Sequence, residues 1–306
     1  MASSFSTVGL IGRQGNPNIL DSLDAVASCL QAHEVAMVVE DATAMLLRNG
    51  EDNGIKSKAA KYQSATRQEL GEGCDLIVVV GGDGSLLGVG RDLAHAGVPV
   101  LGINRGGLGF LADISPTQIE QKIGEVLRGE FVAEDHFLLD ARVFSDGVER
   151  AGSPALNDVV VHLGGMAKMM EFSLWVDDQF VYDQRSDGVI IASPTGSTAY
   201  SLSAGGPIMH PTLDAIVVVP MFPHTLTSRP LVIGGDVEIK VVIGATEQQA
   251  QVSCDSQIDF ALSTADEVRI SKYHAPLQLL FPLGHNFYDS CRSKLDWASR
   301  LGGSAS

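Results

Sequence analysis

The sequence predicts an α/β protein with two domains: a doubly wound N-terminal domain and a C-terminal domain that is mostly β. Two observations lead to this prediction. Strand-like and helix-like segments alternate over about the first 130 residues, which is typical of a parallel sheet covered by helices. Beyond about residue 135, short strand-like runs separated by turn residues replace this alternation. We expect the first domain at 1–134, the second at 135–280, and residues 281–306 packing back on the first.

The first domain is expected to be organised around a strand at 76–80. Its sequence, Leu-Ile-Val-Val-Val, has no polar alternation, which is typical of a central strand buried on both faces. The polar segment 48–57 is expected to be a loop. The expected strands are 7–11, 35–40, 76–80 and 97–103, and the expected helices are 18–32, 42–47, a helix ending near 96, and 116–128.

The second domain is expected to contain nine strands, at 138–144, 157–163, 171–176, 179–182, 188–192, 215–219, 237–242, 250–254 and 267–271. The apolar run 215–223 is interpreted as a core strand, with a subunit contact as the alternative. Residues 287–301 are expected to be helical, and 302–306 to be frayed.

Composition excludes several classes of protein. The 306 residues are 45% hydrophobic and carry a net charge of −16, which argues against a general nucleic-acid binder. No apolar run is long enough to span a bilayer, and the N-terminus lacks the pattern of a secretion signal, so we expect a cytoplasmic protein without a membrane partner. The four cysteines match no metal or disulfide spacing, which suits reduced thiols.

A glycine-rich turn directly follows the central strand: Gly81-Gly82-Asp83-Gly84-Ser85. Glycines let a backbone approach a ligand closely, and amides at a helix N-terminus attract phosphate. Neither the P-loop nor the dinucleotide fingerprint fits this spacing. A carboxylate among phosphate-seeking groups indicates that Asp83 either holds a metal ion or accepts a proton from a hydroxyl that is being phosphorylated. The alternative is an aspartate selected only for turn geometry.

A second group of polar residues lies within the β domain. A buried strand at 188–192 leads into Ser-Pro-Thr-Gly-Ser-Thr-Ala-Tyr-Ser-Leu-Ser at 193–203, which offers amides and hydroxyls to a polar ligand. Arg185 could pair with a phosphate, and Asp187 could accept hydrogen bonds from a ribose or a base amine. Asn157 and Asp158 precede another strand and either cap a turn or present polar groups to a ribose. Ordinary β turns are the alternative for the whole segment.

These stretches resemble the NAD kinase family, in its bacterial, ATP-using type. The resemblance covers almost the whole chain and keeps the order of the motifs, which are Gly81-Gly82-Asp83-Gly84, the segment Asn-Arg-Gly-Gly-Leu-Gly-Phe-Leu at 104–111, Asn157-Asp158, and 187–207. Diacylglycerol and sphingosine kinases share the first motif, and the segments 195–203 and 253–257 favour NAD kinase over them. The implied fold is a doubly wound domain followed by a β-sandwich.

The resemblance also implies roles for individual residues. Asp83 would be the proton acceptor, Gly84 would touch NAD, and Asn157 and Asp158 would bind its ribose or nicotinamide portion. The family commonly has Thr or Asn at the position of Ser85 and Glu at the position of Asp158. Because Asp is shorter than Glu, the reach of the carboxylate at 158 differs from that of the family. The remaining implied NAD-binding residues are Lys168, Arg185, Asp187, Thr195, Thr198, Ala199, Tyr200, Ser201, Leu202, Ser203 and Gln257, of which Lys168 and Arg185 would act in a neighbouring subunit.

The implied reaction transfers a phosphoryl group from ATP to the 2′-hydroxyl of the adenosine ribose of NAD, with a divalent metal such as Mg²⁺. The implied assembly is a homo-oligomer, either a dimer or a tetramer. Two alternative functions are also compatible with the sequence. A lipid kinase of the diacylglycerol kinase type would need an apolar pocket, whereas 195–203 is rich in hydroxyls. A non-catalytic NAD(H) sensor would gain nothing from a carboxylate that faces phosphate.

Overall fold

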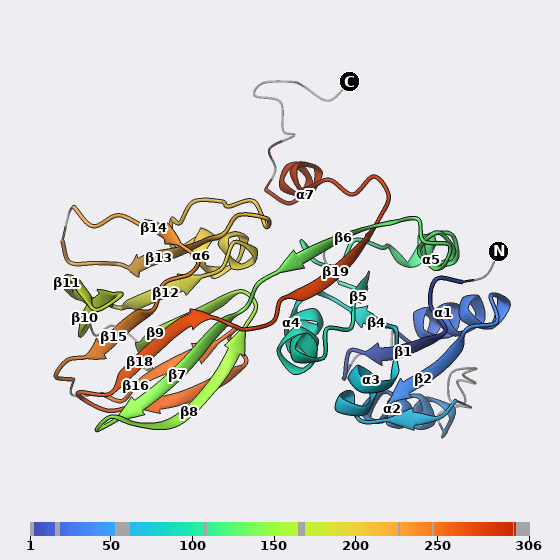
Figure 1. The fold of residues 1–306 in the computed structure, drawn as a ribbon, viewed down its shortest axis with the longest axis horizontal. Coiled ribbons are helices and arrows are strands. Elements are labelled where there is room, and N and C mark those ends of the chain that lie inside the picture. The colour runs from blue at the N-terminus through green and yellow to red at the C-terminus, as the bar shows by residue number, and fades with distance from the viewer. Residues whose placement is uncertain are drawn as a thin grey trace. The chain divides into compact units, whose positions relative to one another are not determined.

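The computed structural model describes residues 3–15, 19–52, 62–106, 109–164, 169–225, 227–246, 248–295 and 297, with the backbone alone at 49–52. The chain forms two compact units (Figure 1). The first unit comprises 1–134 and 277–306, and the second comprises 135–276.

The first unit is built on a seven-stranded sheet with the order β3-β2-β1-β4-β5-β19-β6. The pairs from β3 through β19 are parallel. The chain moves outward from β1 to β2 and β3, and then continues on the opposite side of β1 with β4 and β5. The order therefore reverses between β1 and β4, the position where open α/β sheets bind ligands. The strands are β1 Thr7–Gly12, β2 Ala36–Glu40, β3 Ser64–Ala65, β4 Leu76–Gly81, β5 Val100–Asn104, β6 Phe131–His136 and β19 Leu277–Pro282.

Helices surround this sheet, and an apolar core fills the space between them. All six residues of β4 are buried, which confirms the prediction from its β-branched run. Apolar residues of β1 and β4 share one core with those of α1 and α5. The helices are α1 Leu20–Ala32, α2 Asp41–Asp52, α3 Arg67–Gly73, α4 Asp83–Leu93, α5 Ile119–Leu127 and α7 Phe287–Lys294, with short 3₁₀ turns η3 Ala94–Ala96 and η4 Pro116–Gln118.

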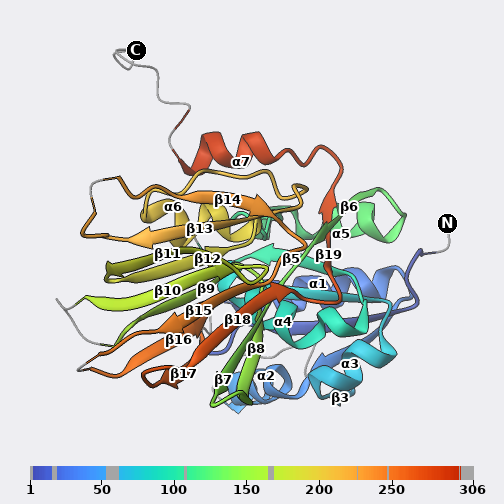
Figure 2. The same cartoon turned by 60° about the vertical axis from the view of Figure 1, so that its left-hand side comes forward.

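The second unit contains two six-stranded antiparallel sheets, ordered β11-β10-β15-β18-β7-β8 and β14-β13-β12-β9-β16-β17 (Figure 2). Apolar residues from both sheets form one common core, as in a β-sandwich. The strands are β7 Leu139–Ser145, β8 Val148–Ala155, β9 Asp158–Leu163, β10 Met170–Val176, β11 Gln179–Ser186, β12 Gly188–Ala192, β13 Ala215–Met221, β14 Leu231–Gly234, β15 Ile239–Ile243, β16 Ala250–Cys254, β17 Ile258–Leu262 and β18 Glu267–Lys272.

The central strands of the second sheet are buried on both faces. Val159 and Val161 of β9 point into the core between the sheets, while Val160 packs on the opposite face with Ile190 and Met209. The 3₁₀ turn η5 (Thr195–Thr198) and the short helix α6 (Tyr200–Ser203) follow β12. Strand β13 is buried over six of its seven residues, so the run that begins at residue 215 is a core strand, as interpreted.

The sequence prediction was wrong or incomplete where apolar periodicity is weak. Helix α2 continues to Asp52, through part of the segment expected to be a loop. The sequence at 48–52 is polar and has no apolar residue like the buried Leu47, so hydrophobic spacing did not predict this end of the helix. Strands β3, β6, β8, β14, β17 and β19 were not predicted. Strand β8 lies at a sheet edge and exposes its first three residues, so it shows no hydrophobic pattern. Of the helix expected at 287–301, α7 accounts for Phe287–Lys294, and most of the rest lies outside the described residues.

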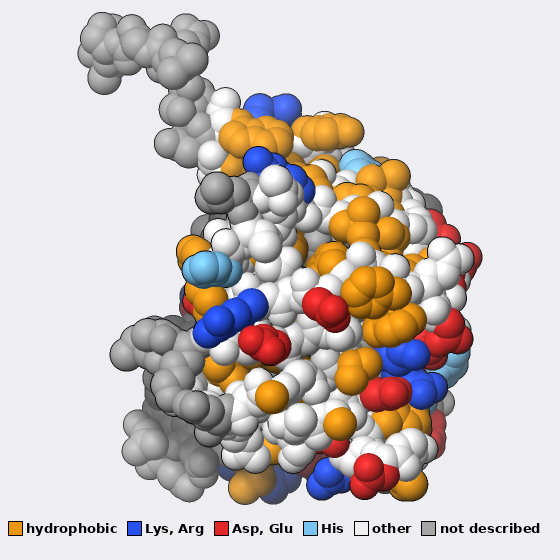
Figure 3. Space-filling view, turned by 90° about the vertical axis from the view of Figure 1, so that its left-hand side faces the viewer, with side chains coloured by type: hydrophobic (Ala, Val, Ile, Leu, Met, Phe, Trp, Pro, Cys, Tyr) orange, Lys and Arg blue, Asp and Glu red, His pale blue; other side chains and the backbone are white. Residues whose placement is uncertain are grey.

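Several hydrophobic side chains of the second unit are exposed on edge strands, including Phe180 and Val181 on β11 and Leu231 and Val232 on β14. On the face drawn in Figure 3, hydrophobic side chains gather in a band with charged side chains on both sides. Among the described helices, none has the length and apolar character required to cross a membrane.

Candidate functional site

Three loops of the first unit meet at the point where the strand order reverses. Gly81 ends β4, Gly82 caps α4, and Asp83 is the first residue of that helix. The chain after β1 attaches here, because the amide of Arg13 donates to the carbonyl of Val80 at 2.9 Å. The chain after β5 attaches beside it, where the amide of Arg105 donates to the carbonyl of Gly81 at 2.6 Å. The glycine turn therefore lies at the carboxyl edge of the sheet, among loops that follow neighbouring parallel strands.

Asp83 binds the loop after β5 through three consecutive backbone amides. Its Oδ2 accepts a hydrogen bond from the amide of Phe110 at 2.6 Å. Its Oδ1 accepts from the amides of Leu111 at 3.1 Å and Ala112 at 3.2 Å. These bonds fix the carboxylate in one orientation, although the side chain is only partly buried. The interpretation of Asp83 as an ordinary turn residue does not account for this contact with a segment 27 to 29 residues away.

Gly109 makes this contact possible. A Cβ atom at this position would collide with the carboxylate of Asp83. Glycine is therefore required by close approach, since the backbone dihedral angle φ at this residue is not positive. The glycine-rich segment that begins after β5 thus serves to hold Asp83.

The hydrogen-bond capacity of the carboxylate determines what chemistry remains available. An ionised carboxylate has about four lone-pair positions, two on each oxygen. Both positions of Oδ1 are used by amides, and Phe110 uses one of Oδ2. One position on Oδ2 is left by these three bonds, and it could accept a proton or bind a metal-coordinated water. The geometry is therefore compatible with both roles predicted for Asp83.

In the second unit, the chain between β8 and β9 is held by Asp255. This buried carboxylate lies in the turn between β16 and β17 and accepts hydrogen bonds from three consecutive amides. Leu156 donates at 3.0 Å to Oδ2, and Asn157 and Asp158 donate at 2.7 and 3.3 Å to Oδ1. The Asn157-Asp158 pair is therefore fixed by a residue that sequence reasoning did not include among the site residues.

Asp158 is the most strongly perturbed carboxyl of this region. It is 2% exposed. Burial raises the pKa of the Asp158 carboxyl to about 7, and the Asp255 carboxylate adds to the rise, whereas a hydrogen bond from the amide of Tyr200 opposes it. Close to neutral pH, this carboxyl can therefore donate as well as accept a hydrogen bond.

The segment after β12 packs directly on Asn157. The amide of Ser193 donates to the carbonyl of Asn157 at 2.9 Å. A Cβ atom at Gly196 would collide with the same carbonyl. Thr195 is buried, and its Oγ1 lies 2.8 Å from Nδ1 of the buried His136. The predicted residues Thr195, Thr198, Ala199, Tyr200, Ser201, Leu202 and Ser203 thus follow one another through η5 and α6, next to Asn157 and Asp158.

Exposure differs widely within this segment. Tyr200 is 42% exposed, Ser203 is also exposed, and Leu202, Thr198 and Ala199 are partly buried. Ser201 is fully buried, and its Oγ has no hydrogen-bond partner among the described residues. Buried hydroxyls without a partner are uncommon in folded proteins.

Arg185 and Asp187 are not brought to this group. They precede Gly188, which pairs with His162, whereas Ala192 at the other end of β12 pairs with Asp158. Four residues of extended strand span about 13 Å. Arg185 is exposed near the end of β11, and Asp187 is partly buried between β11 and β12, both next to this opposite end of β12.

Two of the other predicted residues are exposed. Gln257 is exposed in the turn after β16, two residues after Asp255. Gly84 is exposed in the first turn of α4. Lys168 lies outside the described residues.

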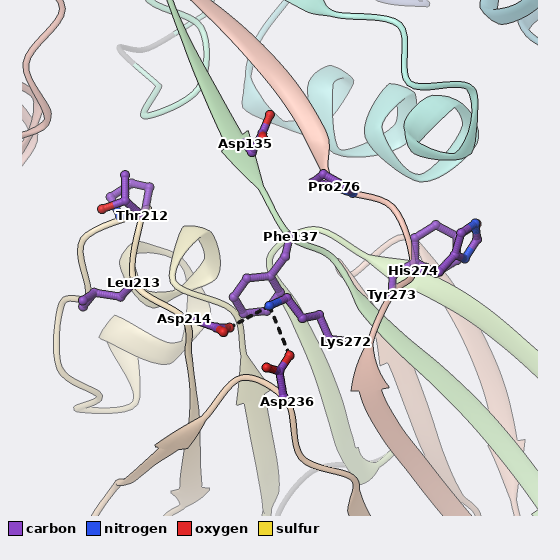
Figure 4. A pocket seen from close by; sticks show the side chains of 11 residues that line it. Asp135, Phe137, Thr212, Leu213, Asp214, Asp236, Lys272, Tyr273, His274 and Pro276 are labelled. Atoms are coloured by element: carbon purple, nitrogen blue, oxygen red, sulfur yellow. Dashed lines mark hydrogen bonds and ion pairs between the residues drawn. The ribbon is translucent and has the colours of Figure 1, made fainter.

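A cavity of about 560 Å³ in the second unit lies elsewhere. It is lined by Phe137, Tyr273 and His274, among others, and Figure 4 shows Lys272 between the carboxylates of Asp214 and Asp236. Lys272 Nζ lies 2.8 Å from the first and 3.3 Å from the second. None of the predicted site residues that the structure describes lines this cavity.

Comparison with known proteins identifies two family models along the chain. The model described as the ATP-NAD kinase N-terminal domain matches residues 8–131, and the model described as the ATP-NAD kinase C-terminal domain matches residues 156–280. The curated NAD kinase of Chromohalobacter salexigens is 50% identical over 299 residues, which cover 97% of this chain and 99% of that protein. The NAD kinase of Pseudomonas aeruginosa strain LESB58 is 50% identical over 301 residues, 98% of each chain.

Two solved structures share the fold of this chain. The yeast NADH kinase complexed with NADH superposes with a TM-score of 0.87 at 24% identity, covering 97% of this chain and 90% of that chain, and shows the shared fold. The NAD kinase from Archaeoglobus fulgidus in complex with ATP superposes with a TM-score of 0.70 at 25% identity, covering 95% of this chain and 97% of that chain.

Proposed function

The chain belongs to the NAD kinase family, and we propose that Asp83 is the residue that accepts the proton during its reaction. The enzyme phosphorylates NAD with ATP and gives NADP. The new bond joins the γ-phosphorus of ATP to the 2′-oxygen of the adenosine ribose, and ADP leaves. The hydroxyl loses its proton as this bond forms. The lipid kinase and the NAD(H) sensor are not favoured by the family assignment.

One observation carries the assignment to Asp83: three amides orient its carboxylate at the switch point of the sheet and leave one lone-pair position on Oδ2. A base that is held in one orientation does not have to reorganise when the proton moves. General-base assistance contributes typically ~10²–10⁴-fold to a rate. The amides at the start of α4 would add favourable interactions with phosphate.

For NAD binding, we propose the residues that the family resemblance implies. The resemblance gives this role to Gly84, to Asn157, Asp158 and Gln257, and to the residues of η5 and α6. This proposal is supported by the shared anchoring of Asn157 and Asp158 through Asp255 and Ser193. A carboxyl with a pKa of about 7 can adjust its proton to a ribose hydroxyl or an amide.

Arg185 and Asp187 are also implied NAD-binding residues, but they lie apart from Asn157 and Asp158. Because they lie at the opposite end of β12, we propose that Arg185 acts in the site of a neighbouring copy, with Lys168 as a second such residue. This requires a homo-oligomer, a dimer or a tetramer. Light scattering coupled to gel filtration tests the assembly, and a monomer with full activity would contradict it.

Mg²⁺ is proposed to enter as the companion of ATP. Mg²⁺ is commonly bound by one or two carboxylates, water and substrate phosphates. Among the described residues, no group of three or more His, Cys, Asp or Glu side chains could hold a metal ion. Asp83, with its remaining Oδ2 position, fits a water of a metal that the triphosphate carries. Bound there, the metal would offset phosphate charge.

We further propose a cytoplasmic location, which suits the four cysteines without disulfide spacing.

Asp83→Asn tests the base assignment. We expect NAD binding, measured by calorimetry, to stay within a few-fold of the wild type, while kcat falls by ~10²–10⁴-fold. The Mg²⁺ concentration that gives half-maximal activity separates the two roles. A proton acceptor leaves it unchanged, whereas a metal ligand raises it when the carboxylate is lost. An Asn variant with nearly native kcat would contradict both roles.

A further inference from the structure

Helix α7, at the end of the described chain, packs on the loop that holds Asp83. The ring of Phe287 lies 6.1 Å from that of Phe110, between centroids. His285, just before the helix, is 3.0 Å from the carboxylate of Asp113 through its Nδ1. Phe110, which supplies one of the Asp83-binding amides, and Asp113, which follows the last of them, are therefore in contact with this C-terminal segment.

Lys294, in the last turn of α7, contributes a cation to this contact. Its Nζ lies 3.9 Å from the centroid of the Phe110 ring, within the range of a cation–π interaction. Within the part of the chain that the structure describes, this ammonium is shielded from water and has no hydrogen-bond partner. Buried charges are normally paired, because their loss of hydration is costly. A purely structural side chain at this position would not need a charge.

The carboxylates of Asp83 and Asp113 are the main negative groups whose charge acts on Lys294, followed by the sulfur of Cys291. Asp113 is already engaged by His285, which holds the pKa of Asp113 below its ordinary value. Burial lowers the pKa of Lys294 to about 8, and the two carboxylates oppose this change. Lys294 forms no ion pair with either carboxylate in the described residues. Its attraction to Asp83 therefore acts through space, next to the ring of Phe110.

Phe110 connects the cation to the catalytic oxygen. Its ring contacts Lys294, and its backbone amide donates the shortest of the three hydrogen bonds, at 2.6 Å, to Oδ2 of Asp83. Oδ2 is also the oxygen that keeps a lone-pair position for the substrate hydroxyl. A displacement of Phe110 would therefore turn that lone pair away from the hydroxyl.

We propose that Lys294 is a positioning residue for Asp83. Its buried ammonium fixes Phe110 from the ring side and attracts the carboxylate, so that helix α7 sets the orientation of Oδ2. The proposal rests on the proposed role of Asp83 as proton acceptor. It requires no contact between Lys294 and either substrate.

The test compares Lys294→Met with Lys294→Arg in the full-length protein. Met keeps the apolar stem and removes the charge, and we expect kcat to fall about tenfold. The KM values for ATP and NAD should stay within twofold. Arg restores a cation that stacks well on an aromatic ring, and it should recover most of the kcat. Arg292→Met is the matched control, because Arg292 is an exposed cation of the same helix, paired with Asp289.

A double mutant distinguishes positioning of Asp83 from a general structural role. If Lys294 acts through Asp83, Lys294→Met should cause no further loss of kcat in an Asp83→Asn background. A further loss of kcat in the double mutant would overturn the proposal. A Lys294→Met variant with native kcat would also overturn it, and so would a Lys294→Met variant in which only the KM for ATP rises. Thermal unfolding of each variant shows whether a loss comes from misfolding, in which case Lys294→Gln repeats the comparison. A nearly native Asp83→Asn enzyme would instead refute the proposed function itself.

Discussion

Asp83 and Asp255 are two carboxylates that perform the same local task in different surroundings. Each accepts hydrogen bonds from three consecutive amides of a distant segment, at 110–112 for Asp83 and 156–158 for Asp255. Asp83 is partly exposed at the start of a helix, whereas Asp255 is 4% exposed and next to a second carboxyl. A carboxylate that anchors a loop therefore remains available for chemistry only where a ligand can reach it.

The largest expected effect on stability comes from Asp255→Ala. Three amides would lose their acceptor in a buried place, and each unsatisfied group costs ~1–3 kcal/mol. We expect a loss on the order of 5 kcal/mol in the free energy of unfolding, measured by urea denaturation. Asp83→Ala should lose less than half of this, because the Asp83 side chain is only partly buried and water can take the place of its carboxylate. Equal losses would remove the distinction between the two carboxylates.

Asp158→Asn tests how the carboxyl next to Asp255 makes the stability of the protein depend on pH. Because the folded protein raises this pKa to about 7, it binds a proton more tightly than the unfolded chain between about pH 4 and 7. Stability of the wild type should therefore decrease as pH rises through this window. Asn mimics the neutral form of the carboxyl. The unfolding free energy of Asp158→Asn should therefore exceed that of the wild type by an amount that grows with pH, up to about 4 kcal/mol at pH 8, and vanishes below pH 4.

Urea denaturation from pH 4 to pH 8.5 measures this difference. Asp259→Asn, at an exposed carboxylate of β17, controls for the removal of one negative charge. Parallel pH profiles for Asp158→Asn and the wild type would contradict the prediction.

Gly109→Ala tests the close approach to Asp83 without removing the carboxylate. The new Cβ would displace the Asp83 side chain, so we expect kcat to fall by about 100-fold, or ~2.7 kcal/mol. Gly106→Ala is the matched control, because a Cβ there would make only an ordinary contact with Asn104. Steady-state kinetics measure both variants, and equal kcat values would show that the orientation of Asp83 is unimportant.

Thr195→Val is expected to have the smallest effect. It removes the 2.8 Å hydrogen bond between Thr195 and His136, which is buried in the second unit. The expected loss is about 1 kcal/mol of unfolding free energy. Thr195→Ser keeps the hydroxyl and should retain more of the stability. A Val variant as stable as the Ser variant would show that this bond is not needed.

The sequence allowed the glycine turn and Asp83 to be predicted, because a buried strand followed by glycines is a local pattern. It did not reveal what holds Asp83, since the donors are backbone amides of Phe110, Leu111 and Ala112, and any residue except proline supplies such a group. Asp255 was missed because its partners are also backbone amides, and they lie 97 to 99 residues away in the sequence. Nothing in the sequence distinguishes Lys294 from a solvent-facing lysine of a terminal helix.

The position of β19 has a consequence for the newly made polypeptide on the ribosome. This strand pairs with β5 and lies between β5 and β6, yet it is synthesised after the whole of 135–276. Until it emerges, the main-chain groups along that side of β5 lack their partner, and an open strand edge invites aggregation. The inserted unit can fold during this delay, whereas the first sheet is completed only after that unit has been made. Nascent chains that stop before β19 should therefore make no NADP.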